Sequence, residues 1–406
     1  MEHHKGNLNH GGASIKLCFF SSLASFDTGM PICTFKLIRH FSNNPEYEVH
    51  LIVPEPGELV ARLQNEKVKV EIIPFSRLRS ARRGADFFRF CVGWPAAVVR
   101  ISGYLKRNKI NIVHFSDFID APFYPAAKLG KAEIVAHLRL CIEKPLQRWF
   151  FSVWAGIFAR KVVCISNAVR KLSGLRDSKT EVVPDPGPDY SLFDPSRAYP
   201  THPALDERKI HLTTIAKFLW VKGHDFFIRM AALVENSLPG AVQFVIVGDR
   251  QKGHERFFDE ITCLARELDI QKAIAIIGQV PHDEIPALLS HTDIFVHLPR
   301  YQEGLGGVVG EAMAMGVPVV AFDSGGVGEC FRDQKDGYLI PHHDFKAAAD
   351  KVISLAKDHG LRKKMGGSAM AYVRERFSLS RHMGAVELIY RDMLKARVRS
   401  NHVDAK

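Results

Sequence analysis

The sequence predicts an α/β fold made of two doubly wound domains, each with a parallel sheet covered by helices. Short, almost continuously apolar runs alternate with longer amphipathic segments, which is the pattern of strands buried between two layers of helices. This rhythm stops at a proline-rich stretch and then starts again. The length of 406 residues is too great for one core and suits two domains of roughly 150 to 200 residues.

In the first half of the chain, helical patterns separate six β-branched runs that we expect to be strands. These runs are Ile15–Phe20, Glu48–Val53, Val68–Ile73, Ile112–Phe115, Glu133–His137 and Val162–Ile165. The stretch from Val183 to Pro203 then holds six prolines and is the best candidate for a linker between the domains.

The second half repeats the pattern and ends in helices. Its expected strands are Ile210–Ala216, Val242–Val247, Ile274–Ile277, Ile294–His297 and Val319–Phe322, and its last helical segments are Ala347–Leu355, Arg362–Phe377 and Leu379–Arg397. We therefore expect a disordered tail over residues 1–13, an amino-terminal domain over 14–190 and a carboxyl-terminal domain over 191–378. A final helix over 379–406 is expected to return to the first domain.

Charge and cysteine content narrow the class of protein. Lys and Arg number 55 against 44 Asp and Glu, so an anionic partner such as a nucleic acid, an acidic membrane or a phosphorylated ligand is favoured. The seven cysteines are scattered without a C-x-x-C pair, which suggests neither a disulfide framework nor a zinc site. No signal-peptide pattern follows Met1, and no apolar run reaches the roughly 18 residues of a membrane span. We expect a cytoplasmic protein, soluble or peripheral on the inner face of the cytoplasmic membrane.

The stretch from 299 to 329 is the most informative, because it places Glu303 and Glu311 eight positions apart around a helix start. Three glycines in it are Gly304, Gly306 and Gly307. They let the backbone turn from a strand into a helix whose first amides are unpaired, and such a helix start favours a phosphate. The loop follows a parallel strand, so it lies on the rim where these sheets bind ligands. A phosphate site with two carboxylates that accept from hydroxyls indicates a nucleotide or a sugar.

Two lysines follow the first strand of the second half. Lys217 and Lys222 are five residues apart, with Gly223 after the second, so both ammonium groups can converge on one diphosphate. The alternative is a solvated basic loop. Taken alone the alternative is favoured, but an acidic loop on the same rim reverses the balance towards a diphosphate.

These residues resemble the motifs of the retaining glycosyltransferases of family 4, whose GT-B architecture has two Rossmann-like domains facing across a cleft. The resemblance covers about Ile15 to Leu394 and is strongest from Thr213 to Glu329. It implies that Glu303 contacts the donor sugar and that Glu311 holds the ribose hydroxyls of a nucleotide. It also implies that Lys217 and Lys222 hold the donor phosphates, although Lys217 stands where the family usually has arginine.

Weaker matches extend the implied site. The resemblance assigns the donor side to Gly248, Leu305 and Val280, with Val280 in a loop that contacts the base, and to the glycines at 304, 306 and 307. The family's paired glycines near the amino terminus are represented by Thr28 and Gly29 on the acceptor side. For the first-domain histidine that the family places near the reacting sugar, the residues His137 and Arg139 are equally good candidates.

The resemblance implies retention at the anomeric carbon. As the glycosidic bond breaks, negative charge grows on the leaving phosphate, and the two lysines with the helix start at Gly306 lie where they would meet it. No D-x-D sequence occurs, so we expect no metal and no cofactor beyond the nucleotide diphosphate sugar. Glu303 is expected to position hydroxyl groups.

Two further segments have open interpretations. A basic aromatic region from Arg77 to Trp94 suits either an anionic membrane that bears a lipid-linked acceptor or a solvated helix with aromatics in the core. The segment from Lys144 to Lys161 is too short to span a bilayer and is expected to be a buried core helix.

The leading hypothesis is an enzyme that transfers a sugar from a nucleotide diphosphate to a saccharide or lipid-linked saccharide, in the synthesis of surface polysaccharide or lipopolysaccharide. An epimerase or hydrolase of nucleotide sugars is the second enzymatic hypothesis, and it would act without a sugar acceptor. A basic module that binds membrane or nucleic acid is the third. Dispersed charge and the lack of a recognition motif argue against nucleic acid as a partner.

Overall fold

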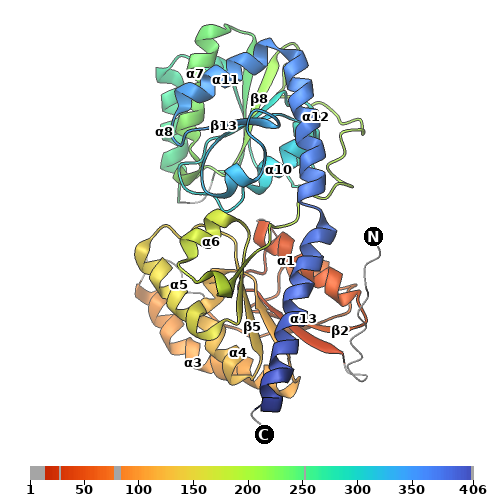
Figure 1. Cartoon of the computed structure of the whole chain (residues 1–406). Coiled ribbons are helices and arrows are strands. Elements are labelled where there is room, and N and C mark those ends of the chain that lie inside the picture. The colour runs from red at the N-terminus through yellow and green to blue at the C-terminus, as the bar shows by residue number, and fades with distance from the viewer. Residues whose placement is uncertain (1–13, 27–28, 77–83, 251–252, 404–406) are drawn as a thin grey trace, which may run out of the picture.

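The computed structural model describes residues 14–26, 29–76, 84–250 and 253–403, and it contains two parallel sheets with helices on both faces (Figure 1). The first sheet has seven strands in the order β3-β2-β1-β4-β5-β6-β7, and the second has six in the order β10-β9-β8-β11-β12-β13. This confirms the predicted fold class. The tail expected over residues 1–13 lies outside the described residues.

The first sheet follows the predicted strands closely. Its strands are β1 (Ile15–Phe20), β2 (Tyr47–Val53), β3 (Val68–Ile72), β4 (Ile112–Phe115), β5 (Glu133–Leu138), β6 (Lys161–Cys164) and β7 (Thr180–Val182). The helices between them are α1 (Gly29–Ser42), α2 (Glu58–Arg62), α3 (Gly84–Arg107), α4 (Tyr124–Leu129), α5 (Pro145–Phe158) and α6 (Asn167–Ser173).

The second sheet repeats this arrangement. Its strands are β8 (Ile210–Ile215), β9 (Val242–Val247), β10 (Ile274–Ile277), β11 (Ile294–His297), β12 (Val319–Phe322) and β13 (Gly337–Ile340). Its helices are α7 (His224–Ser237), α8 (Glu255–Glu267), α9 (Ile285–Ser290), α10 (Gly307–Ala314), α11 (Phe345–Lys357) and α12 (His359–Arg376), and α13 (Leu379–Val403) follows them.

The sequence did not predict the edge strands β7 and β13. Each is short, and neither forms a continuous run of β-branched residues. Their extended conformation comes from pairing with β6 and β12, whose apolar residues are buried. Pairing with a neighbouring strand thus decides their structure more than their own residues do.

Helix α13 packs against the first sheet, although it follows the second sheet in sequence (Figure 1). One of its faces enters the core that covers β1 and β2, through Met383, Val386, Ile389, Tyr390 and Met393. The Tyr390 ring is completely buried, and its hydroxyl lies 2.5 Å from Nδ1 of His114 on β4.

Between the two sheets the chain passes from one core to the other. Val183 is buried in the first core and Phe193 in the second. Between them, Gly187 accepts from Nζ of Lys36 at 3.0 Å and donates to the carbonyl of Phe377 at 2.7 Å. The expected boundaries at residues 190 and 378 fall in this passage, and the division into domains at those positions stays a prediction.

The expected core helix at 144–161 is wrong on one face. Helix α5 buries only Phe151 and Ala155, while other large apolar side chains on it face outward. A helix that covers one face of a sheet has a single side available to the core, so a second apolar stripe remains exposed. Among the described residues, no helix is both long and apolar enough to cross a membrane.

The basic aromatic region divides between its two interpretations. Trp94 and Phe90 pack on the core, and the Trp94 indole donates to the carbonyl of Pro122 at 2.8 Å. Phe87 and Phe88 are exposed. The arginines from 77 to 83 lie outside the described residues.

Replacement of Tyr390 tests how much α13 contributes to the first core. Tyr390→Ala should lower the free energy of unfolding by about 3–5 kcal/mol, because a buried aromatic ring is lost and a cavity remains. Leu388→Ala removes an exposed side chain from the same helix and should change stability by roughly 0.5 kcal/mol or less. Calorimetric unfolding of both variants measures the difference, and equal losses would contradict the packing role of α13.

Candidate active site

The loop between β11 and α10 carries the paired glutamates. At its end Gly306 adopts a left-handed conformation with φ of 75° and serves as the N-cap of α10. A Cβ atom at Gly307 would meet nothing within 4 Å, so the first turn of the helix is open. Glu303 forms an isolated parallel bridge with Gly325, and its carbonyl accepts from the amide of Gly326 at 2.8 Å. The loop is therefore anchored on one side and open at the helix start.

Lys222 reaches this loop from the segment between β8 and α7. Its Nζ donates to Oε1 of Glu303 at 2.6 Å. The contact depends on Gly223, which has φ of 69° and lies so close to the loop that a Cβ atom would sit 2.0 Å from the carbonyl oxygen of Leu298. Only glycine fits this approach, and the two loops are also joined by the Arg300 amide, which donates to the carbonyl of Val221 at 3.0 Å.

The surroundings keep Glu303 ionised. Burial alone would raise the pKa of Glu303, but the Lys222 ammonium and His297 outweigh it and hold the pKa below its usual value. His297, at the end of β11, is buried, and burial lowers its pKa to about 4. Its Nε2 has no hydrogen-bond partner among the described residues and lies 3.8 Å from the position of a Cβ atom at Gly306. Sequence analysis missed His297, although it closes the strand before the acidic loop.

Glu311 lies in the second turn of α10 and pairs with a histidine that sequence analysis also missed. Nε2 of His282 is 2.9 Å from Oε1 of Glu311. This hydrogen bond is the main reason that the pKa of His282 is raised. His282 follows β10 in the same loop as Val280, so the base-side loop and the α10 carboxylate meet.

The other residues assigned to the donor side also lie at the carboxyl ends of their strands. Lys217 follows β8, and Gly248 follows β9, with a Cβ atom at Gly248 falling 1.9 Å from the carbonyl oxygen of Ala216. Val280 packs on the core beneath α10, and Leu305 packs against the cores of both sheets. These positions share one rim of the second sheet, and their roles stay predictions.

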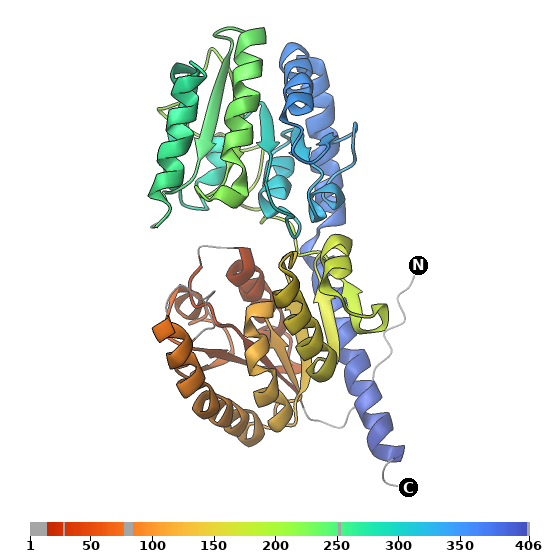
Figure 2. The same ribbon diagram turned by 90° about the vertical axis from the view of Figure 1, so that its left-hand side faces the viewer.

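The acidic loop is also where the two sheets meet. Gln302 donates its amide to Glu143 at 2.7 Å, and the Gly304 carbonyl accepts from Oγ of Ser166 at 2.7 Å. A Cβ atom at Gly304 would lie 2.1 Å from the carbonyl oxygen of Arg139. All three first-sheet partners come after β5 or β6, so the carboxyl ends of both sheets face each other (Figure 2).

A second contact between the sheets comes from Glu329. Its carboxylate accepts hydrogen bonds of 2.9 Å from the amide and side chain of Asn167 and from the amide of Ala168, at the start of α6. The unpaired amides of that helix start are thereby satisfied from the other sheet.

The first-sheet candidates His137 and Arg139 are both enclosed. His137 has no exposed surface and lies beside His114, with Nδ1 of His137 3.2 Å from Nε2 of His114. Burial, with the charge of Arg139, holds the pKa of His137 well below its usual value. Arg139 Nε donates to Asp185 at 3.0 Å, and its Nη2 is buried without a hydrogen-bond partner in the described parts of the chain. Arg139 contacts the donor loop through its backbone, whereas His137 contacts the His114 ring beneath it.

The linker residue Asp185 was not singled out by the sequence. It receives Arg139 and also lies 3.6 Å from Nε2 of His137, so one carboxylate holds both candidates. On the acceptor side, Gly29 is the first residue of α1 and is exposed, whereas Thr28 lies outside the described residues.

The site can bind a phosphorylated ligand without requiring new charges. It offers an ammonium group, two carboxylates and an open helix start on one rim. No group of three or more His, Cys, Asp or Glu side chains in the described ranges is arranged to hold a metal ion. Metal independence stays a prediction.

Comparison with known proteins identifies this rim. Residues 197–371 match the family described as glycosyl transferases group 1. These residues belong to the group 1 glycosyltransferases. The match includes both lysines, both glutamates and all of α10.

Relatives of this glycosyltransferase chain agree with the assignment. The D-inositol 3-phosphate glycosyltransferase of Corynebacterium aurimucosum is 31% identical over 227 residues, which are 54% of this chain and 53% of the relative. The N-acetyl-alpha-D-glucosaminyl L-malate synthase of Bacillus anthracis is 33% identical over 191 residues, which are 47% of this chain and 48% of the relative. The chain thus spans about half the length of the curated relatives that it matches.

Among solved structures, the Anabaena protein HepE in complex with UDP and glucose superposes with a TM-score of 0.76. The superposition covers 93% of this chain and 100% of HepE, at 18% sequence identity. A sucrose-phosphate synthase from Thermosynechococcus elongatus gives a TM-score of 0.73 over 94% of this chain and 100% of that protein, at 17% identity. At these identities the likeness shows the fold, which is the GT-B arrangement of the glycosyltransferases.

The close approach at Gly223 can be tested against a matched glycine. Gly223→Ala should weaken the Lys222–Glu303 contact and destabilise the glycosyltransferase, because the new methyl group collides with the Leu298 carbonyl. Gly240→Ala carries a similar φ of 72° but meets nothing within 4 Å, so it isolates the cost of the left-handed backbone, about 1–2 kcal/mol. Thermal unfolding compares them, and an equal loss in both would show that the collision is relieved.

The His282–Glu311 pair predicts a pH dependence with a defined sign. Because the folded pKa of His282 is raised, its contribution to stability is complete below its usual value of about 6.5 and is lost as the pH rises through the folded pKa. The difference in melting temperature between the wild type and His282→Gln should therefore shrink from acid to alkaline pH. His359→Gln, at an exposed histidine, serves as the control. A difference that does not vary with pH would contradict the ion pair.

Proposed function

We propose that the protein is a retaining glycosyltransferase that moves a sugar from a nucleotide diphosphate donor to a saccharide or lipid-linked saccharide, without a metal ion. The observation that carries the proposal is the contact of Lys222 with Glu303 beside the open start of α10. A cation, a carboxylate and unpaired amides within one loop cluster match a diphosphate joined to a sugar. The group 1 match covers these residues, which supports the proposal.

The identity of the donor is supported by neighbours in structure. HepE is described in complex with UDP and glucose, and the TarM glycosyltransferase structure from S. aureus also includes UDP. We infer that a UDP-sugar is the first donor to test. The proposed orientation places the diphosphate at Lys217, Lys222 and the α10 start, with the ribose hydroxyls at Glu311 and the sugar at Glu303.

In the proposed reaction, the bond between the anomeric carbon and the diphosphate oxygen breaks while the acceptor hydroxyl oxygen forms its bond on the same face. The growing charge on the leaving diphosphate is met by Lys222 and the amides of α10. Lys222 must then divide its hydrogen bonds between the phosphate and Glu303. Glu303, held ionised, accepts from sugar hydroxyls and stabilises positive charge at the anomeric carbon.

The proposed setting is the synthesis of surface polysaccharide or lipopolysaccharide on the cytoplasmic side of the membrane. Its support is the breadth of saccharide and small hydroxylated acceptors among the names of the relatives, from inositol phosphate to malate. Arg139 and His137, after and on β5, are the proposed first-sheet contribution near the reacting sugar.

Two substitutions separate donor binding from turnover. Glu311→Ala should abolish the rise in melting temperature that a UDP-sugar causes in the wild type, because the ribose contact is lost. Lys222→Ala should lower kcat by roughly a hundredfold or more, since one stabilising charge is removed from the leaving phosphate. Lys346→Ala, an exposed lysine on α11, is the matched control and should change neither.

The measurements are thermal shift with UDP-, GDP- and ADP-sugars and product analysis with and without saccharide acceptors. Full activity in both variants would place the site elsewhere. Conversion of the donor at an equal rate without any acceptor would favour the epimerase or hydrolase hypothesis.

A further inference from the structure

Helix α5 exposes a continuous apolar stripe. Leu146, Trp149, Val153 and Ile157 are spaced by three or four residues, so they lie on one side of the helix, and their exposed fractions run from 37% to 75%. The opposite side buries Phe151 and Ala155 in the core of the first sheet. Because both sides of α5 are apolar, the outer stripe has no role in the core.

Helix α3 repeats this feature. Phe88, Val92 and Val99 are between 63% and 68% exposed, and Phe87 is 54% exposed. The side that faces the sheet carries Ala97, Val98 and Ile101 in the same core as α5. Two helices that bury their inner sides in one core must turn their outer sides in the same general direction.

The short helix α4 joins the two stripes into one face. It packs against both α3 and α5, and Leu129 at its end is 54% exposed. Figure 2 shows the three helices side by side on one face of the first sheet. We call this surface the α3–α5 face. It holds nine of the large apolar side chains that are exposed in the described parts of the chain, namely Phe87, Phe88, Val92, Val99, Leu129, Leu146, Trp149, Val153 and Ile157.

The charges on this face are almost all positive. Within the three helices the only acidic residue is Asp86, against Arg89, Arg100, Lys106, Arg107, Lys128 and Arg148. None of these six basic residues forms an ion pair with another residue of the described ranges. An apolar centre surrounded by unpaired cations is complementary to a surface that is apolar inside and anionic outside.

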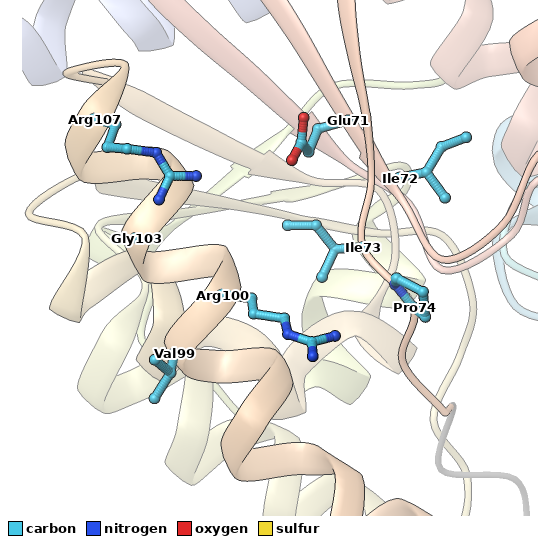
Figure 3. A pocket seen from close by; sticks show the side chains of 8 residues that line it. All are labelled: Glu71, Ile72, Ile73, Pro74, Val99, Arg100, Gly103 and Arg107. Atoms are coloured by element: carbon cyan, nitrogen blue, oxygen red, sulfur yellow. The ribbon is translucent and has the colours of Figure 1, made fainter.

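A cavity at the edge of the face adds a place for an anionic head group (Figure 3). It lies between α3 and the end of β3, has a volume of about 420 Å³, and is lined by Arg100, Arg107, Val99 and Ile73 among others. Figure 3 shows both arginine side chains extending from α3 towards the β3 segment, where Glu71 is the one acidic residue of the lining. Two cations and apolar walls suit a phosphate joined to a hydrocarbon chain.

We propose that the α3–α5 face docks on an anionic lipid bilayer. The apolar stripes of α3 and α5 enter the interfacial layer, and the six basic residues lie at the level of the lipid phosphates. A second copy of the chain is a poorer occupant, because docking the face on itself would bring these unpaired cations together. The inference deepens the proposed function by supplying a surface that bears lipid-linked acceptors, and it rests on that function only for this purpose.

Vesicle binding by the full-length protein tests the proposal. The wild type should sediment with vesicles of phosphatidylethanolamine and phosphatidylglycerol, and less with vesicles of phosphatidylcholine alone. Leu146→Ser combined with Ile157→Ser should lower the partition coefficient by roughly tenfold or more, since two large side chains no longer leave water. Arg100→Gln combined with Arg107→Gln should reduce the preference for the anionic vesicles and weaken its dependence on salt.

The matched control is Leu379→Ser combined with Leu388→Ser, which removes two exposed leucines from α13, a helix on the opposite face of the first sheet. This variant should bind vesicles like the wild type, and thermal unfolding verifies that all variants are folded. Failure of the wild type to bind, or an equal loss in the control, would overturn the proposal. So would a wild-type dimer in sedimentation velocity that ignores vesicles and becomes monomeric in the Leu146/Ile157 variant.

A thermal shift with UDP, run on the same samples, separates this proposal from the proposed function. A retained UDP shift with no vesicle binding overturns the docking face alone. Vesicle binding without any response to nucleotides or nucleotide sugars leaves the docking face in place and overturns the assigned donor site.

Discussion

The site depends on backbone segments that approach each other more closely than any side chain permits. At Gly223 and at Gly304, a Cβ atom would fall about 2 Å from a carbonyl oxygen of a neighbouring loop, once within the second sheet and once between the sheets. The first approach brings Lys222 to Glu303, and the second seats the acidic loop against Arg139. Loss of either hydrogen atom to a methyl group therefore moves charged groups as well as the backbone. Geometry at two glycines thus fixes the electrostatics of the whole rim.

The charges on the rim are arranged as pairs that a ligand can divide. Lys222 contacts Glu303, His282 contacts Glu311, and Arg139 contacts Asp185. A paired carboxylate stays ionised in a partly buried position, where burial alone would favour its neutral form. Each pair leaves further donors or acceptors for a phosphate or a hydroxyl. This arrangement keeps the site stable while it retains the capacity to bind a charged substrate.

Much of the fold was predictable, because a buried parallel strand must be apolar on both faces and reads as a continuous run. Runs such as Val242–Val247 and Ile294–His297 match their strands residue for residue. The acidic loop was equally visible, because glutamates at a fixed distance around glycines form a local pattern. His282, His297 and Asp185 were not visible, because each acquires its partner only when distant segments meet. The outer stripe of α5 was misjudged, since apolar periodicity does not show which side of a helix faces the core.

The position of α13 has a consequence for the order in which the protein is made. One face of the first sheet is covered by residues 383–393, which a ribosome adds only after the entire second sheet has been synthesised. Until then the apolar side chains of β1 and β2 on that face lack their cover, although the rest of the amino-terminal half has left the exit tunnel. The nascent chain must therefore hold an incomplete core during translation of about half its length, a period in which chaperones and aggregation compete for it.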